Sequence, residues 1–367
     1  MADVAAGIGG VAPLVPPGKR KQSFPPLSKG PDENTAPLSL ALQGGGSHGA
    51  YTWGVLDALL ENRSLWVEAI SGTSAGAMNA VVFAYGYGKG ASEHTDRAKG
   101  HEAGCALARE LLKKFWEGVG ALGSLFFGAP LQNNPMLSMM AQWLSPYQTN
   151  PLDINPLRGL LEKVVDFEFL QKEQGKHAPK VFVCATNVRT GSADVFSGAR
   201  LTADAVMASA CLPMLFKAVN IDGENYWDGG YSGNPLIYPL IYHTGNHDVL
   251  LVQLNPAEYR GLPDSAQDIL DRMSEITFNA SLLAELRAIA FVRRLLEQGR
   301  LDPALYKNML IHHIDGGREL QSYGASSKSK ANMSFVLELF DKGQSSGQRW
   351  LERHRKDVGV RSELHDT

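Results

Sequence analysis

Two glycine-rich turns lie close together near the start of the chain, each between an apolar segment and a helix-like segment. The first is Gly44–Gly49 (GGGSHG), and the second is Gly72–Gly76 (GTSAG). Either motif is ambiguous by itself, because Gly-x-Ser-x-Gly arises by chance and Gly-x-Gly-x-x-Gly also binds dinucleotides. Their combination in this order favours an oxyanion hole followed by a nucleophilic serine, as in an ester hydrolase.

The second turn has the context that a nucleophilic serine requires. Val67–Ile70 is typical of a buried strand, and Ala75–Ala84 is typical of a helix of small and apolar residues. Ser74 is therefore predicted at a tight strand-to-helix turn, where Gly72 and Gly76 leave room for the bend. The hydroxyl would lie near the positive end of the following helix, which stabilises an anion. The alternative is that the motif only connects a strand to a helix.

The first turn follows the apolar run Leu38–Leu42 and precedes Ala50–Leu60, whose leucines recur at helical spacing. Successive N–H groups in such a turn bind an anion, either a pyrophosphate or the oxygen of a tetrahedral intermediate. A dinucleotide site needs an acidic residue at the end of the next strand, about twenty positions on. Glu68 has that distance, but apolar residues continue past it into the serine turn, so the pattern favours the oxyanion hole.

A candidate base lies in Tyr226–Pro235 (YWDGGYSGNP), where Asp228 ends an aromatic strand and Gly229 and Gly230 allow close backbone approach. An aspartate with an ordinary pKa of about 4 is a weak base at neutral pH. The role therefore requires direct contact with Ser74 in a site closed to water. The alternative is an ordinary Asp-Gly-Gly turn.

Taken together, these motifs resemble the patatin-like phospholipases and acyl hydrolases over roughly residues 38–255. Ala208–Phe216 and Asn234-Pro235 are similar to further segments of that family. The resemblance implies a three-layer α/β/α fold with a mostly parallel central sheet and a helical cap insertion. It also implies a Ser74/Asp228 dyad without histidine. The glycines that it assigns are Gly44, Gly45, Gly46 and Gly49 in the oxyanion hole, with Gly72, Gly76, Gly229 and Gly230 as motif support.

The resemblance further implies two-step acyl transfer through an acyl-serine, with a phospholipid, lysophospholipid or other fatty-acyl ester as substrate. No cofactor is expected, and the metal-ligand spacings of His, Cys and Asp are missing near the motifs. Peripheral contact with a membrane or lipid surface is a further expectation. The head group, the position cleaved, the chain length, the choice among ester, thioester and polyester, and the oligomeric state are left open.

One departure from the family pattern is His48, at a position where many members have arginine or lysine. We predict that His48 orients the oxyanion loop and transfers no proton. The change weakens any inference that an anionic head group is required.

A Ser-His-Asp triad is the main rival mechanism, because histidines follow Asp228 in the order expected of an α/β-hydrolase. The candidates are His243, His247, His312 and His313, of which the last two follow a predicted late strand. The short spacing between the two glycine turns favours the dyad. A catalytically silent lipid-binding or scaffold protein is a second alternative, although the intact Ser74 and Asp228 argue against it.

Composition agrees with an enzyme of this kind. The 367 residues are 44% hydrophobic, enough for a large core, and the formal charge of −3 gives no indication of nucleic-acid binding. Cys105, Cys184 and Cys211 form no close pair, which favours a reducing, cytoplasmic setting. No apolar run is long enough to span a membrane.

The predicted organisation is a disordered tail over 1–36, a hydrolase domain over 37–345 and a charged tail over 346–367. In the first tail, Lys19–Lys21 follow the apolar stretch, which is the wrong order for a secretory signal and favours a solvated segment over contact with anionic lipid. Within the domain, a cap insertion is predicted at about residues 100–160. Its irregular part, 121–157, is rich in bulky apolar residues that include Met139 and Trp143. Both a lid over the acyl site and a helix packed on the core explain it.

The remaining pattern alternates strands with helices, which predicts a mostly parallel sheet covered on both faces. Strands are predicted at 181–188 and 249–254, helices at 103–117 and 201–211, and a glycine-rich break at 86–100. A long helix is predicted over 266–298. Its apolar positions are expected to face one way: Ile269, Met273, Ile276, Leu283, Leu286 and Ile289.

Overall fold

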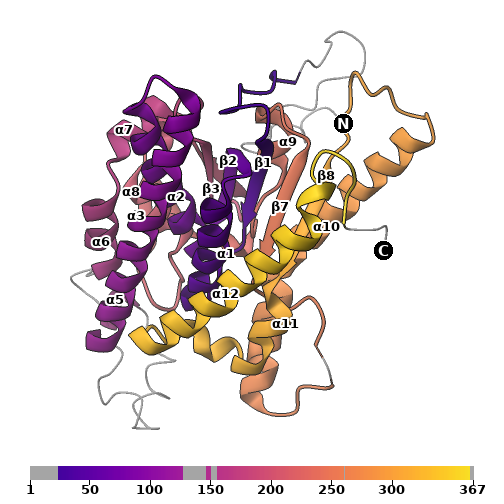
Figure 1. Ribbon diagram of the computed structural model, residues 1–367. Helices are drawn as coiled ribbons and strands as arrows, with labels where there is room; N and C mark the ends of the chain where they lie inside the picture. Colours follow the sequence, from indigo (N-terminus) through magenta and orange to yellow (C-terminus); the bar gives the residue numbers. More distant parts are fainter. Residues whose placement is uncertain (1–23, 127–145, 150–154, 260, 364–367) are drawn as a thin grey trace.

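The computed structural model describes residues 24–126, 146–149, 155–259 and 261–363. An eight-stranded sheet runs through this part of the chain in the order β5-β6-β3-β2-β1-β7-β8, with β4 also paired to β3 (Figure 1). The strands are β1 (Ala36–Leu42), β2 (Leu65–Thr73), β3 (Lys180–Asn187), β4 (Ala193–Phe196), β5 (Val219–Ile221), β6 (Glu224–Asp228), β7 (Asp248–Gln253) and β8 (Leu310–Asp315). Five neighbouring strands of the sheet are parallel, namely β3, β2, β1, β7 and β8. The other three pair antiparallel.

Helices cover both faces of this sheet, so the predicted three-layer α/β/α architecture is confirmed. One face carries α1 (Gly49–Asn62), α2 (Ala75–Ser92), α3 (Arg97–Phe126) and α12 (Met333–His354), and the other carries α9 (Tyr238–His243) and α10 (Ala266–Glu297). Alternation along β1 divides its side chains between the two cores. Leu40 and Leu42 pack under α1, whereas Ala41 joins the core under α9 and α10.

Shorter elements connect these layers. The helices are α5 (Pro146–Thr149), α6 (Pro156–Val164), α7 (Phe167–Glu173), α8 (Ala203–Ser209) and α11 (Gly316–Leu320). The 3-10 turns are η1 (Gly46–His48), η3 (Gly198–Arg200), η4 (Gly229–Tyr231), η5 (Gln321–Tyr323), η6 (Ala325–Ser329) and η7 (Arg355–Asp357).

The predicted glycine-rich break at 86–100 is wrong, because α2 continues through its glycines to Ser92. These glycines let α2 and α3 approach closely. A Cβ atom at Gly86 would lie 2.6 Å from the Cα of Ala108, and one at Gly90 would lie 2.6 Å from the carbonyl oxygen of Ala103. The helix propensity lost at each glycine is offset by contact between the two helices.

The predicted N-terminal tail is too long at its C-terminal end. Residues 24–35 lie against the domain, where the Ser28 hydroxyl donates to Glu68 Oε1 over 3.3 Å. Glu68 also accepts hydrogen bonds from the backbone N–H groups of Gly245 and Asn246. Glu68 on β2 thus binds both the segment before β1 and the turn that precedes β7. Residues 1–23 lie outside the described part of the chain.

The predicted charged tail from residue 346 is also wrong, because α12 passes that position without interruption. Trp350 on this helix is buried. Beyond the helix, the Ser362 hydroxyl and the Glu363 N–H donate to the Ile311 carbonyl on β8 over 3.0 and 2.9 Å. Residues 346–363 therefore belong to the folded domain.

The apolar positions of α10 do not all face one way as predicted. Ile289 is buried, and Leu286 packs against the same core. Ile269, Met273, Ile276 and Leu283 are instead 43%, 59%, 55% and 37% exposed. None of the helices described combines the length and the apolarity needed to cross a bilayer.

Candidate active site

Ser74 lies between β2 and α2 in a backbone conformation that side chains rarely adopt, with φ 55° and ψ −122°. Such a residue costs on the order of 1–3 kcal/mol and persists only where its surroundings hold it. A Cβ atom at Gly72 would lie 2.5 Å from the Gly76 carbonyl oxygen, and one at Gly76 would collide with the Leu42 carbonyl. The N–H of Ser74 donates to the Ser209 hydroxyl on α8 over 2.8 Å. The two glycines and α8 therefore hold the sharp turn that the motif predicted.

The first glycine loop runs directly against this turn. A Cβ atom at Gly44 would lie 2.7 Å from the Thr73 carbonyl oxygen and 2.8 Å from the Ser74 Cβ. The N–H of Gly44 donates to Asn234 Oδ1 over 2.7 Å, and that of Gly49 donates to carbonyls of its own turn. Both amides are engaged within the protein, so we do not expect Gly44 and Gly49, which the family resemblance assigns to the oxyanion hole, to serve there as N–H donors.

The two remaining glycines of the loop, Gly45 and Gly46, line a cavity together with Ser74. Gly46 has a φ of 57°, and a side chain there would collide with the backbone of Lys328. Gly49 instead provides close packing, since a Cβ atom there would lie 2.6 Å from that of Ala75.

Asp228 ends β6 and is 2% exposed. Its Oδ1 atom accepts a hydrogen bond from the Gly230 N–H over 2.7 Å. Burial raises the pKa of this carboxyl to about 7, against the lowering effect of the hydrogen bonds from Gly230 and the Ser74 side chain. The carboxylate is thus in contact with the serine and has the pKa of a base that works at neutral pH.

The sheet brings these two residues together from distant parts of the sequence. Thr73 at the end of β2 pairs with Cys184 on β3, and the neighbouring Ala185 pairs with Asp228 on β6. The two glycines after Asp228 pack closely against their neighbours. A Cβ atom at Gly229 would meet the Cys184 carbonyl, and one at Gly230 would meet the Phe278 ring. A side chain at either glycine would therefore collide, and the motif-support role of the two glycines stays a prediction.

The cavity beside Ser74 and Asp228 has a volume of about 400 Å³ and mostly apolar walls. Trp116, Val119 and Leu122 on α3 form one wall, so the first part of the predicted cap insertion is a helix packed on the core whose end reaches the cavity. Residues 127–145, with Met139 and Trp143, lie outside the described part. The other apolar lining residues are Ala75, Met78, Pro156, Leu157, Ala210, Leu212, Leu215, Phe216, Phe278 and Ala331.

Lys328 on η6 is a lining residue that the motifs did not indicate. Its ammonium group donates to Asn255 Oδ1, and the amide of Asn255 donates to the Gly44 carbonyl over 3.2 Å. Burial lowers the pKa of Lys328, although Glu275 and Asp271 act in the opposite direction. The amino group of Lys328 is therefore held beside the glycine loop by a segment that is remote in the sequence, which is why no local pattern revealed it.

His48 is buried under the same loop, and its Nε2 lies 2.7 Å from the Ser327 hydroxyl. That hydroxyl donates to the Gly324 carbonyl, so it accepts from a protonated Nε2. Burial and the nearby Lys328 lower the pKa of His48 to about 3, so the ring is neutral at pH 7. His48 ties the loop to η6, and the absence of proton transfer stays a prediction.

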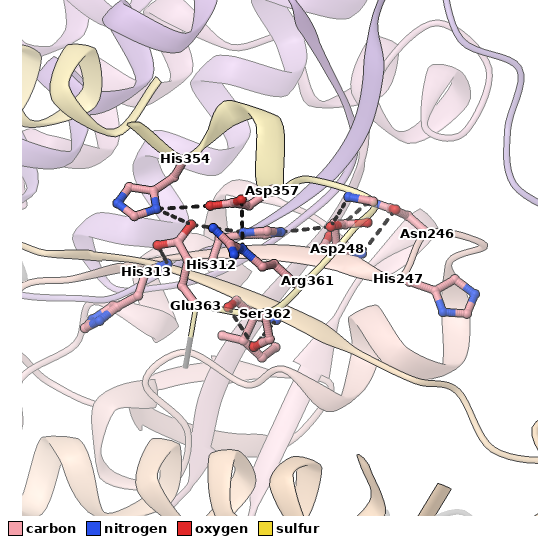
Figure 2. A network of polar contacts seen from close by, with 12 residues as sticks. Asn246, His247, Asp248, His312, His313, His354, Asp357, Arg361, Ser362 and Glu363 are labelled. Atoms are coloured by element: carbon pink, nitrogen blue, oxygen red, sulfur yellow. Dashed lines mark hydrogen bonds and ion pairs between the residues drawn. The ribbon is translucent and has the colours of Figure 1, made fainter. Parts of the chain in front are cut away.

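The rival histidines lie elsewhere. His312 and His313 are on β8, which β7 and β1 separate from β2. Figure 2 shows His312 between Asp248 and Glu363, at 2.8 and 3.1 Å, and the His313 Nε2 lies 3.0 Å from Gln253 Oε1.

The other two candidates are likewise engaged away from the serine. His243 stacks on Phe182, and the Nδ1 of His247 lies 2.9 Å from the Asn308 carbonyl oxygen. None of the described residues that line the cavity is a histidine. The geometry therefore does not support a triad. Across residues 24–363, as far as they are described, no cluster of three His, Cys, Asp or Glu side chains is arranged to hold a metal ion.

Comparison with known families shows to which family the chain belongs. The sequence model of the patatin-like phospholipases matches residues 40–241, more than half of the chain and a span that includes both Ser74 and Asp228. The chain is a member of the patatin-like phospholipase family. Membership in this family supports lipid ester hydrolysis as the general activity and a lipid as the substrate.

The individual proteins found in the comparisons are only distantly similar to this chain. A search of curated proteins found no match. Among solved structures, VipD from Legionella pneumophila is 16% identical with a TM-score of 0.32, over 89% of this chain and 71% of VipD. The complex of SpcU with ExoU from the type III secretion system of Pseudomonas aeruginosa is 14% identical with a TM-score of 0.26, over 90% of this chain and 74% of the matched one.

Proposed function

We propose that this protein is a serine lipid acyl hydrolase that cleaves fatty-acyl esters of phospholipids or lysophospholipids through Ser74 and Asp228. The observation that carries the proposal is the contact between a strained, cavity-facing serine and a buried carboxylate whose pKa is raised to about 7. A neighbouring histidine is not needed, because burial has already made the aspartate a stronger base.

In the first step, Asp228 takes the proton from the Ser74 hydroxyl as the serine oxygen attacks the ester carbonyl carbon. The carbonyl oxygen becomes an oxyanion, which the N–H groups of Gly45 and Gly46 and the N-terminus of α2 stabilise. The protonated Asp228 then gives its proton to the departing alcohol oxygen, and an acyl-serine remains.

In the second step, water replaces the alcohol. Asp228 accepts a proton from the water as its oxygen attacks the acyl-serine, and it returns that proton to Ser74 as the fatty acid leaves. The same carboxylate thus serves both steps, and each step leaves the enzyme in its starting protonation state.

The shape and charge of the cavity support the substrate class. A volume of about 400 Å³ lies within the range of ligand pockets, and the leucine, valine and aromatic walls suit an acyl chain. Lys328 adds a positive charge beside the glycine loop, near the motif position where His48 replaces a basic residue. We infer that Lys328 pairs with the phosphate of a phospholipid.

The test combines turnover with active-site labelling on the full chain. Wild type, Ser74→Ala, Asp228→Asn and the matched control His313→Gln are assayed on a medium-chain p-nitrophenyl ester and on phosphatidylcholine vesicles, with a fluorophosphonate as the serine probe. We expect turnover by wild type and His313→Gln only, and no labelling of Ser74→Ala.

Two outcomes contradict the proposal in different ways. Loss of turnover in His313→Gln, with the fold intact by circular dichroism, would replace the dyad by a triad. Wild type that is neither labelled nor active on any acyl ester would instead indicate a catalytically silent lipid-binding protein.

A further inference from the structure

The outer face of α10 is apolar over most of its length, although it faces solvent (Figure 1). The inner face packs through Leu282 and Ile289 on the sheet, and Phe278 reaches the cavity. On the outer face, the exposed apolar side chains are Ile269, Leu270, Met273, Ile276, Leu283 and Phe291. A contiguous apolar surface of this kind marks an interaction site, whereas single exposed apolar residues do not.

The spacing of these residues is that of a helix-pairing seam. Ile269, Ile276 and Leu283 repeat every seven positions, and a second series of Met273, Ala280 and Arg287 lies between them. The alternating steps of four and three residues are those of a coiled coil, in which one helix packs along another. From Ile269 to Phe291 the seam is about 33 Å long, at about 1.5 Å per residue.

The charges along the helix favour a second copy of the same chain as the partner. On the outer side, Asp264 and Asp268 lie at the N-terminal end of the helix, whereas Arg287 and Arg294 lie toward its C-terminal end. When two such helices run antiparallel, the acidic segment of each lies beside the basic segment of the other. A parallel arrangement would place like charges together.

The centre of the seam fits a two-fold axis. Ala280 is exposed and lies midway between Ile269 and Phe291. In an antiparallel pair centred there, Ile269 meets Phe291 of the second copy and Met273 meets the aliphatic part of Arg287. The small side chains of Ala280 and Ala284 allow the two backbones to approach where the helices cross.

We propose that the protein forms a homodimer through antiparallel pairing of α10 from two copies, centred on Ala280. Asp271, Ser274 and Phe278 line the cavity from the adjoining side of the same helix. The dimer therefore covers the outer side of a helix whose inner side forms a cavity wall. Dimer formation is tested by measuring association, independently of any enzymatic turnover.

Sedimentation velocity of the full chain tests this proposal at concentrations from about 1 to 100 µM, a range that resolves micromolar affinities. Wild type should shift from monomer to dimer. Ala280→Arg places two like charges at the axis and should weaken association at least about 100-fold. The matched control is Leu337→Arg, because Leu337 is a 41% exposed leucine on α12 and should leave the dimer unchanged.

A charge exchange separates specific pairing from general damage. Asp264→Lys with Asp268→Lys makes the charges at these four positions all basic, and Arg287→Glu with Arg294→Glu makes them all acidic. Each double variant should be monomeric alone, and a mixture of the two should restore a heterodimer. Thermal melts followed by circular dichroism check that each variant is folded.

Three results overturn the proposal. These are a wild type that stays monomeric throughout the range, an Ala280→Arg variant that still forms the dimer, and charge-exchanged variants that do not associate when mixed. If wild type is monomeric but floats with phosphatidylcholine vesicles and Ala280→Arg does not, the face binds lipid instead.

Discussion

Asp228 and Asp248 are both buried aspartates of the central sheet, but their surroundings differ. Asp228 adjoins the cavity, where it contacts Ser74 and accepts the Gly230 N–H. Asp248 lies in a closed network with His312 (Figure 2). It also accepts the Gly359 N–H over 2.7 Å.

This difference is the reason that we assign the Asp248–His312 pair a structural role and propose Asp228 as the base. His312 is fully buried between two carboxylates, and the network joins β7 and β8 to the C-terminal segment. Asp228 has no cation as a partner among its pKa-shifting neighbours, so burial raises its pKa. The unbalanced carboxylate suits proton transfer, and the balanced one suits structural support.

The largest expected effect is the loss of activity in Asp228→Asn. We expect kcat/KM to fall about 1,000-fold or more, because the proposed base of both steps is removed. Stability should change the other way. At about pH 8 the wild type contains a buried, charged carboxylate, which the variant replaces by a neutral amide. The unfolding free energy of the variant should therefore be higher by on the order of a few kcal/mol.

Ester hydrolysis and urea unfolding of both proteins, at about pH 5 and pH 8, measure the two effects. The stability gain should be smaller at about pH 5, where Asp228 in wild type is mostly protonated. A variant that lost stability and activity together would assign Asp228 a structural role.

The opposite pattern is expected of His312→Ala. Removal of the ring leaves Asp248 and Glu363 without their shared cation, which should cost about 3 to 5 kcal/mol of unfolding free energy. The kcat/KM of the folded fraction should stay within about twofold of wild type, because β8 is remote from Ser74. Urea unfolding and an ester assay measure these quantities. His247→Ala, at an exposed position on the same side, is the control, and equal losses in both variants would contradict the network.

The pH dependence should separate the two regions. Burial lowers the pKa of His312, but hydrogen bonds and charges of Asp248 and Glu363 outweigh it and raise the pKa from 6.5 to about 8. This contribution to stability is complete below 6.5 and is lost as the pH rises through 8, by about 2 kcal/mol. Activity should instead increase as Asp228 loses its proton, with an apparent pKa of about 7.

A urea-midpoint series and a kcat/KM profile, over about pH 5 to 9, test both directions. In His312→Ala the loss of stability between about pH 7 and 8 should disappear, whereas the loss below pH 7 that Asp228 causes and the rising limb of the activity profile should stay. An activity profile that changed with His312 would show that the two regions are coupled.

The smallest expected effect concerns Lys328→Met, which keeps an unbranched side chain of nearly the same length and removes its charge. We expect a loss of about 10-fold in kcat/KM on a phospholipid, as for one charge-assisted hydrogen bond, and little change on a p-nitrophenyl ester that has no phosphate. The ratio of the two values is the measurement. Equal losses on both substrates would mean that Lys328 only holds the glycine loop through Asn255.

Short sequence windows predict those parts of the site whose chemistry depends on the local backbone geometry. The turn at Ser74 needs glycine at positions 72 and 76, and an apolar strand and a helix must flank it, so a short window predicts it. The same holds for the Asp-Gly-Gly at the end of β6. Where a residue acts through a distant partner, short windows failed, as with Lys328 and with the amides of Gly44 and Gly49.

Composition also misled where packing overrides propensity. Gly86 and Gly90 indicate a break in an isolated segment, but contact with α3 keeps them helical. The charges after residue 346 suggested a solvated tail, although Trp350 is buried and Glu363 joins His312.

The sequence by itself determined the family, the alternation of strands and helices, and the identities of the nucleophile and base candidates, because steric demands of tight turns are local. Only the tertiary structure decided which groups meet. It brings Asp228 to Ser74 across β3, buries that carboxylate so that its pKa rises, and places Lys328 at the cavity. It also leaves the outer face of α10 exposed. These properties depend on burial and on contacts between segments far apart along the chain, which no local pattern encodes.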